Sequence, residues 1–261
     1  MSELRKRCPN MTKLVLVQVN LSNVSVQCNA VLARIIVTLY SVNTCRLTLR
    51  VFHFQVKIES LPSKLTHFRL ISCLTSPDWF QNFSMHLEVL DLSLSSKLSN
   101  NDVTTVCQSC NSIKVLHLNG CYRLTSSCMQ RVFDELKDLR ILGVKDTQFD
   151  ELALCCLAAK QTNLQALAIG HKTKEKRKLL PNNVLLCQLP AFTKLRHLDL
   201  SHSLTEEETV RSLTRLLQRL ETLDLRETLV SESDLELCMT DNKIAVNADW
   251  TDAMKYEFDR T

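Results

Sequence analysis

The hexapeptides LEVLDL (residues 87–92) and IKVLHL (residues 113–118) decide the fold, because each has apolar residues at its first, fourth and sixth positions. Six further hexapeptides keep this pattern, namely MTKLVL, LTHFRL, LRILGV, LQALAI, LRHLDL and LETLDL, which begin at Met11, Leu65, Leu139, Leu164, Leu195 and Leu220. Apart from a first step of 54 residues, consecutive hexapeptides are 22 to 31 residues apart. This recurrence indicates an internal structural repeat that runs along the chain.

The segments between the hexapeptides have apolar residues at helical spacing, and several open with a residue that can cap a helix, as in NNDVTTVCQSC (100–110) and DELALCCLAAKQ (150–161). A strand followed by a helix every 20 to 29 residues or so is typical of a leucine-rich repeat. We therefore predict an α/β fold, a right-handed leucine-rich-repeat solenoid of about eight repeats. A parallel sheet would line the concave side of the horseshoe and helices the convex side, with KIAVNA (243–248) as the edge strand.

Composition excludes several classes of function. Lys plus Arg number 32 and Asp plus Glu 28, too small an excess to indicate a nucleic-acid partner. The three glycines, Gly120, Gly143 and Gly170, are isolated and form no phosphate-binding loop, and neither H-E-x-x-H nor G-x-S-x-G occurs. We expect no enzyme activity, no cofactor and no metal; a Cys–His catalytic dyad is the alternative that the sequence leaves open.

The twelve cysteines raise the question of compartment. Because the opening residues MSELRKRCPN do not resemble a signal peptide, we expect a soluble protein with reduced thiols in the cytoplasm, the nucleus or both. The longest apolar run is shorter than the roughly 20 residues that a membrane-spanning helix needs, so no membrane partner is expected. Cys73, Cys110 and Cys121 are expected to be buried small side chains, while the spacing of Cys107 and Cys110 leaves a zinc or redox site as the alternative.

Three stretches, KRCPNMTKLVL (6–16), IESLPSKLTHFRLISC (58–73) and LHLNGCYRLTSSCM (116–129), resemble the F-box and leucine-rich-repeat proteins. That resemblance implies the substrate-recognition part of a Skp-cullin-F-box ubiquitin ligase receptor, which binds a protein substrate on its concave face. In the family, an F-box that precedes the repeats binds the Skp-type adaptor and thereby the cullin, and we expect this F-box to be absent from the present chain. The alternative is a free leucine-rich-repeat scaffold that recruits no ligase.

Residues 24–55 depart from the family pattern, because they contain no acidic residue, lysine, glycine or proline. Removing these 32 residues shortens the first step from 54 to 22 residues, and codons at both edges of the segment can form splice sites. We favour the hypothesis of a translated retained intron. The alternative is a missed repeat, with VLARIIVTL (31–39) or CRLTLRV (45–51) as a genuine strand or helix. The chain then divides into a first repeat (1–23), the insertion (24–55), further repeats (56–240) and a C-terminal cap and tail (241–261).

Alternation along each strand predicts which side chains lie on the concave face. The candidate partner-binding residues are His67, Arg69, Asp91, His117, Lys145, His197, Asp199, Asp224 and Arg226. The middle of this face is moderately apolar and its charges are mixed in sign, which suits a protein partner. As surface positions, His117 and Asp199 are expected to tolerate substitution. Asp199 and Asp224 are expected to line up as an acidic ladder, unless Arg226 neutralises it.

The basic run HKTKEKRK (171–178) lies in the longest repeat. A solvated loop between a strand and the next helix is one interpretation, and a patch for nuclear import or for an acidic partner is the other.

Overall fold

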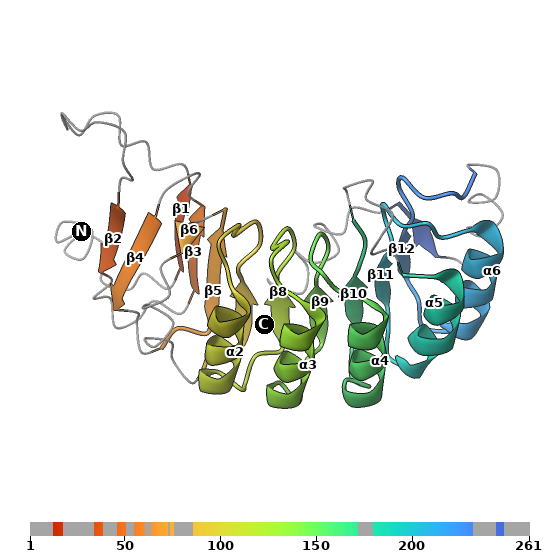
Figure 1. The fold of residues 1–261 in the computed structure, drawn as a ribbon, viewed down its shortest axis with the longest axis horizontal. Coiled ribbons are helices and arrows are strands. Elements are labelled where there is room, and N and C mark those ends of the chain that lie inside the picture. Colours follow the sequence, from red (N-terminus) through yellow and green to blue (C-terminus); the bar gives the residue numbers. More distant parts are fainter. Residues whose placement is uncertain are drawn as a thin grey trace.

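The computed structural model describes residues 13–17, 34–38, 46–50, 55–60, 64–72, 74–75, 86–171, 180–231 and 244–247. Its main feature is a parallel sheet of ten strands, which follow one another along the long axis of the molecule (Figure 1). In sheet order the strands are β1 (Lys13–Val17), β3 (Arg46–Arg50), β5 (His67–Ile71), β7 (Val89–Asp91), β8 (Val115–His117), β9 (Ile141–Gly143), β10 (Ala166–Ala168), β11 (His197–Asp199), β12 (Thr222–Asp224) and β13 (Ala245–Val246).

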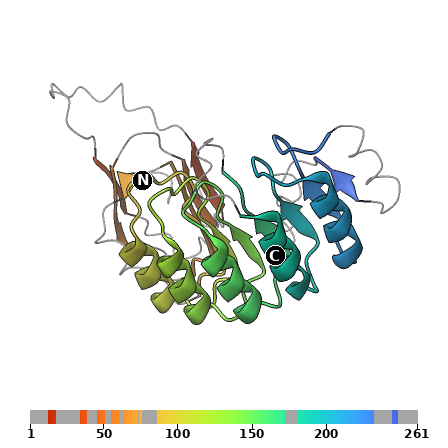
Figure 2. The same ribbon diagram turned by 45° about the vertical axis from the view of Figure 1, so that its right-hand side comes forward.

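Helices stand in a row along one face of this sheet (Figures 1 and 2). They are α2 (Asn100–Ser109), α3 (Ser126–Glu135), α4 (Glu151–Lys160), α5 (Asn182–Gln188) with the 3-10 turn η3 (Leu189–Ala191), and α6 (Glu207–Leu216). From β7 to β12 the chain alternates between a sheet strand and a helix on the convex side. This arrangement confirms the predicted α/β leucine-rich-repeat solenoid.

The N-terminal part differs from the expected convex layer of helices. Along the chain, the first main-sheet strands are separated by β2 (Arg34–Thr38), β4 (Gln55–Ser60) and β6 (Leu74–Thr75). These three strands pair in parallel and form a second sheet. The chain therefore alternates between two sheets before it begins to alternate between sheet and helix. Stretches such as RIIVT in β2 are rich in β-branched residues, which favours a strand over a helix.

Strand β3 lies inside the segment 24–55 and pairs with β1 on one side and β5 on the other. Leu47 and Leu49 are in register with Phe68 and Leu70 of β5. The missed-repeat alternative expected a strand in CRLTLRV, and the structure contains one there. The retained-intron hypothesis, together with the domain boundaries drawn from it, concerns the origin of the segment and stays a prediction.

The leucines of the hexapeptides form one continuous core between sheet and helices. Leu90, Leu116, Leu142, Leu167, Leu198 and Leu223 are register partners in successive strands, and all are buried. Side chains cap the N-termini of two helices, Ser99 at α2, one residue before the expected Asn100, and the expected Asp150 at α4. Ser99 forms a capping box with Asp102 at α2, and the carboxylate of Asp150 accepts a hydrogen bond from Ala153 N at α4.

Four free cysteines belong to this core, as expected for Cys110 and Cys121. Burial raises the pKa of Cys110 to about 11, of Cys121 to about 12 and of Cys128 to about 11. Thiols with such pKa values stay protonated and poorly reactive at neutral pH. Cys73 lies outside the described residues.

A left-handed residue follows most strands and turns the chain toward the convex side. Leu94, Gly120, Asp146, His202 and Glu227 have positive φ values between 54° and 76°. For the first four of these residues, the backbone N–H donates to a carbonyl of the next repeat, as in Gly120 N to Lys145 O at 2.7 Å. These bonds hold the turns of neighbouring repeats together.

Candidate partner-binding face

Two rows of side chains cross the face of the sheet that lies opposite the helices. The first row contains the first residue of each main-sheet strand from β5 to β12: His67, Val89, Val115, Ile141, Ala166, His197 and Thr222. The second row contains the third residue of each strand: Arg69, Asp91, His117, Gly143, Ala168, Asp199 and Asp224. Seven of the nine candidate residues therefore lie in these rows, and Lys145 and Arg226 follow two residues after the second row.

The aspartates of the second row shape the turns that follow their strands. Asp91 Oδ1 accepts a hydrogen bond from Ser93 N at 3.0 Å, and Asp199 Oδ1 accepts one from Ser201 N at 2.9 Å. Asp224 Oδ1 accepts the equivalent bond from Arg226 N at 3.1 Å. Each aspartate thus stabilises its own repeat in the manner of an Asx turn.

The expectation that the candidate residues are surface positions is wrong for five of them. His67, Asp91, His117, Asp199 and Asp224 are all buried. The physical reason is crowding, because in-register parallel strands lie only about 4.8 Å apart and each side chain shields its neighbours in the row. Substitutions at His117 and Asp199 therefore disturb packed polar groups.

Lys145 and Asp199 form a buried ion pair that spans β10. Lys145 Nζ lies 2.8 Å from Asp199 Oδ2 and also donates to Ser201 Oγ at 2.5 Å. Only 14% of the Lys145 side chain and 2% of the Asp199 side chain are exposed. The methyl side chain of Ala168, which lies between them in the second row, leaves room for the lysine to cross.

The two aspartates of the expected acidic ladder are in register, but basic side chains balance their charges. Asp199 and Asp224 are register partners, as expected. Arg226 Nε lies 2.9 Å and 3.0 Å from the two carboxylate oxygens of Asp224, and its Nη2 is also paired with Oδ2. Since Lys145 neutralises Asp199 as well, the structure favours the alternative in which basic side chains of the chain itself balance both carboxylates.

The other end of the face contains two neutral histidines. Burial, followed by the charges of Arg46 and Arg69, lowers the pKa of His67 to about 4, although Glu88 opposes the shift. Burial also lowers the pKa of His117, while nearby Asp91 raises it and Arg69 lowers it further. Arg69 Nε lies 3.9 Å from Asp91 Oδ2.

Neutral imidazoles act as hydrogen-bonding groups rather than as cations. His67 Nδ1 lies 2.8 Å from Thr66 Oγ1, and His67 Nε2 has no hydrogen-bond partner among the described residues. His197 Nδ1 lies 2.9 Å from Thr222 Oγ1.

Between these polar ends the face is apolar. Val115, Ile141 and Ala166 pack together as a small cluster that is separate from the leucine core. This position agrees with the apolar middle expected from the sequence.

Sequence reasoning missed a row of accessible charges immediately before the strands. Lys114 Nζ lies 2.7 Å from Glu88 Oε1, and Arg196 Nη1 lies 3.4 Å from Glu221 Oε1. The side chain of Arg140, between them, is about half exposed. The sequence signal for this row is the second position of each hexapeptide, where these charged residues lie.

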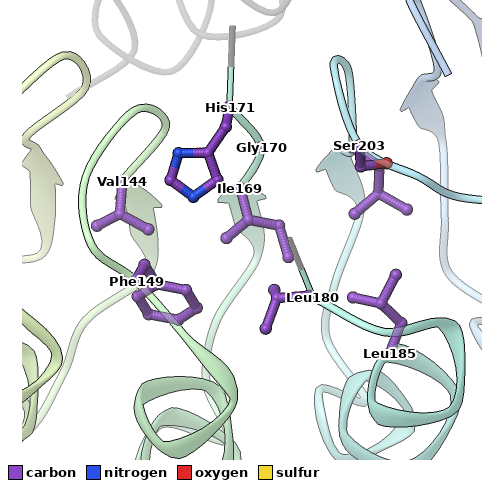
Figure 3. Close-up of a pocket in the computed structure, with 9 residues that line it drawn as sticks. Val144, Phe149, Ile169, Gly170, His171, Leu180, Leu185 and Ser203 are labelled. Atoms are coloured by element: carbon purple, nitrogen blue, oxygen red, sulfur yellow. The ribbon is translucent and has the colours of Figure 1, made fainter. Parts of the chain in front are cut away.

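A small hollow lies at the turn after β10 (Figure 3). It is lined mainly by apolar side chains, among them Val144, Phe149, Ile169, Leu180 and Leu185, with His171 at the same site. The space open to the centre of a water-sized sphere is about 10 Å³, which is room for roughly one water molecule. This hollow is too small for an organic ligand. Of the basic run 171–178, only His171 is among the described residues.

Neither a metal site nor a membrane-spanning helix is present among the described residues. They contain no group of three or more His, Cys, Asp and Glu side chains placed to hold a metal ion. In the same part of the chain, no helix combines the length and the apolar character needed to cross a membrane.

Comparison with solved structures identifies the architecture. A chain of the yeast Rad7 and Elc1 complex superimposes with a TM-score of 0.51 over 81% of this chain and 69% of that chain, at 13% identity. The fold is that of a leucine-rich-repeat solenoid. Internalin C2 of Listeria monocytogenes has a TM-score of 0.48 at 19% identity, over 71% of this chain and 70% of that chain. LegL7 of Legionella pneumophila has a TM-score of 0.47 at 16% identity, over 70% of this chain and 66% of that chain. At 13% identity, the match to the chain of the yeast complex shows the fold alone.

Comparison of sequences adds one curated relative. No family model matches the chain. The Caenorhabditis elegans protein named "Putative RNA-binding protein EEED8.10" is 29% identical over 114 residues. The match spans 43% of this chain and 15% of that protein, so most of the relative has no counterpart here.

Proposed function

We propose that this solenoid is the substrate-recognition part of a Skp-cullin-F-box ubiquitin ligase receptor. The ligase context comes from the resemblance of KRCPNMTKLVL, IESLPSKLTHFRLISC and LHLNGCYRLTSSCM to the F-box and leucine-rich-repeat proteins, in which the closest likeness is to the twelfth member. The Skp-type adaptor and the cullin would be reached only through an F-box. A receptor of this kind works in the cytoplasm, the nucleus or both.

The arrangement of side chains on the concave face is the observation that supports a role in binding. An apolar cluster lies in its middle, in which Val115 is partly exposed and Ile141 and Ala166 are buried, and accessible charged pairs such as Arg196 with Glu221 lie along its edge. An apolar centre inside a polar rim is the usual anatomy of a protein–protein interface. The rigid sheet beneath it holds these side chains in fixed positions.

The second candidate function is a free leucine-rich-repeat scaffold that binds a partner without recruiting a ligase. The same face supports it equally. RNA binding, which the name of the C. elegans relative mentions, is not proposed, because Lys145, Arg69 and Arg226 on the face each lie beside an aspartate. Basic side chains balanced in this way leave little positive charge for phosphates.

Co-purification separates the two candidates. The chain and the product of a full-length transcript that encodes an upstream F-box are expressed in cells, and the captured proteins are identified. We expect the Skp-type adaptor and a cullin with the F-box form, and a shared set of partners with both forms. Absence of the adaptor and the cullin from the F-box form would leave the scaffold function.

A pair of charge reversals tests whether the concave face is the binding surface. Arg196→Glu changes the edge of the face, and Arg131→Glu changes an exposed position on α3. We expect Arg196→Glu to weaken capture of the shared partners by about ten-fold, or about 1.4 kcal/mol, and the Arg131 control to leave it unchanged. Equal effects of the two changes would argue against a concave-face site.

A further inference from the structure

Leu94, in the turn after β7, occupies a position that is unfavourable for a leucine. Its φ of 62° lies in the left-handed region, where a bulky residue is an outlier, and 54% of the residue is exposed. At the equivalent place in other repeats the chain has glycine or a polar residue, namely Ser72, Gly120, Asp146, His202 and Glu227. A lone exposed leucine is ordinary, but one that also strains the backbone points to a role outside folding.

The turn after β8 continues this apolar surface. Leu94 N donates to Asn119 O at 2.7 Å, so the two turns are in direct contact. The side chain of Leu94 lies over Gly120, since a Cβ at Gly120 would lie 2.5 Å from Leu94 Cδ2. Two residues further on, Tyr122 is 59% exposed. Two adjoining turns therefore expose large apolar side chains at the edge of the sheet where its parallel strands end (Figure 1).

Both turns are held in place by hydrogen bonds within the chain. Leu98 N donates to Ser95 O at 3.1 Å inside the first turn. The second turn is fastened to the next repeat, because Gln148 Nε2 donates to Tyr122 O at 3.2 Å. A surface that is ordered before binding loses less conformational entropy when a partner binds.

Each turn also has an exposed basic side chain. The first turn, SLSSKL (93–98), contains Lys97, the second, NGCYRLT (119–125), contains Arg123, and neither stretch contains an acidic residue. Within the part of the chain that the structure describes, neither Lys97 nor Arg123 forms an ion pair. The basic side chains of the concave face, in contrast, lie beside aspartates. Positive charge on these turns is therefore available to carboxylates of another molecule.

We propose that Leu94, Lys97, Tyr122 and Arg123, here called the turn patch, bind a protein segment in which apolar residues are flanked by Asp or Glu. The apolar side chains would pack on Leu94 and Tyr122, and the carboxylates would form charge-assisted hydrogen bonds with the two basic side chains. The inference goes beyond the proposed function, because the turn patch lies outside the concave face and binds whether or not a ligase is recruited.

Fluorescence polarisation with labelled decapeptides tests the inference on the full chain. Each peptide has two central residues chosen from Leu, Phe and Trp, two Glu on either side of them, and Ser at the ends. The best of these peptides should bind about ten-fold more tightly than its matched controls, one with Lys in place of Glu and one with Ser in place of the central pair. Equal binding of the lysine control, binding of none of the acidic peptides, or tighter binding of a uridine oligonucleotide would overturn the proposal.

Variants locate the contact. Lys97→Glu, Arg123→Glu and Tyr122→Ser should each weaken binding of the best peptide by about ten-fold. Matched controls are Arg131→Glu on α3 and Leu152→Asn on α4, which change exposed residues elsewhere and should leave binding unchanged. Control variants that weaken binding as much as the patch variants would contradict the proposal.

Leu94→Asn separates a binding role from a structural one. Asparagine tolerates the left-handed conformation better than leucine does, so the melting temperature should stay the same or rise while peptide binding falls about ten-fold. A clearly lower melting temperature would show that Leu94 serves the fold and would overturn its assignment to the patch. The concave-face change Arg196→Glu should leave peptide binding intact, which distinguishes failure of this inference from failure of the proposed function.

Discussion

Lys145 and Asp199 are paired across the strand that separates their repeats, since Lys145 Nζ lies 2.8 Å from Asp199 Oδ2 and β10 lies between β9 and β11. The pair fastens three consecutive repeats to one another on the concave side. Solenoids depend on contacts between neighbouring repeats, so a contact that reaches the second neighbour extends cooperativity beyond the nearest interface.

Lys145→Met should destabilise the protein by about 3 to 5 kcal/mol, because it leaves a buried carboxylate without its cation. The double variant with Asp199→Asn should recover much of this loss, since a neutral side chain no longer needs the lysine. Urea unfolding of both single variants and the double variant measures the coupling. Additive losses would mean that the two charges do not interact in solution.

Leu198→Ala should cost about 2 to 5 kcal/mol, because Leu198 is almost fully buried between sheet and helices and its loss opens a cavity. Leu152→Ala is the matched control, since Leu152 is 65% exposed on α4. Its cost should stay below about 0.5 kcal/mol. Chemical denaturation measures the free energy of unfolding of both variants. Similar losses of stability in the two would contradict the assigned core.

The leucine positions were predictable because burial of the first, fourth and sixth residues of each hexapeptide from residue 65 onward recurs in these repeats and leaves a periodic pattern in the sequence. The polar face was harder to predict. The sequence gives no sign that Asp199 is buried, because that depends on Lys145 reaching across Ala168 from another repeat. The second sheet was missed for a different reason. Short apolar stretches such as RIIVT are compatible with a strand, a buried helix or an insertion, and only their pairing partners decide.

Alanine substitutions at Gly120 and Gly170 should lower the free energy of unfolding by different amounts. A Cβ at Gly120 would lie 2.5 Å from Cδ2 of Leu94, a side chain that can move, and φ is +76°. Gly120→Ala should therefore cost about 1 to 2 kcal/mol, mainly from the left-handed backbone. At Gly170 the Cβ would lie 2.2 Å from the backbone oxygen of Ser201, which cannot move without displacing the next repeat. Thermal unfolding should show a clearly larger loss for Gly170→Ala, and the reverse order would exclude this explanation.

Deletion of residues 24–55 tests the origin of that segment. Because β3 pairs with both β1 and β5 along its whole length, we expect the deletion to lower the melting temperature. The retained-intron hypothesis predicts the opposite result, a higher melting temperature and a greater soluble yield, since β1 would then stack directly on β5. Differential scanning calorimetry of the unmodified chain and of the chain without residues 24–55 distinguishes the two expectations. Sequencing the transcript end to end tests the retained-intron hypothesis independently.

Acidification should destabilise the protein through His67. The pKa of His67 is lowered from 6.5 to about 4 in the folded protein, first by burial and then by Arg46 and Arg69, with Glu88 opposing. Between these two pH values the unfolded chain binds the proton more readily than the folded one, so stability falls as the pH drops from about 6.5 to about 4. Above pH 6.5 the imidazole is neutral in both states and contributes no slope.

The variant His67→Gln isolates this contribution, because glutamine keeps a hydrogen-bonding side chain of similar reach and does not titrate. Other acid-sensitive groups, His117 among them, remain in both proteins and cancel in the comparison. The free energy of unfolding of the unmodified chain should therefore fall more steeply than that of His67→Gln as the pH is lowered from 6.5 to 4, and the two curves should run parallel above pH 6.5. Parallel curves throughout would show that His67 titrates alike in the folded and unfolded states.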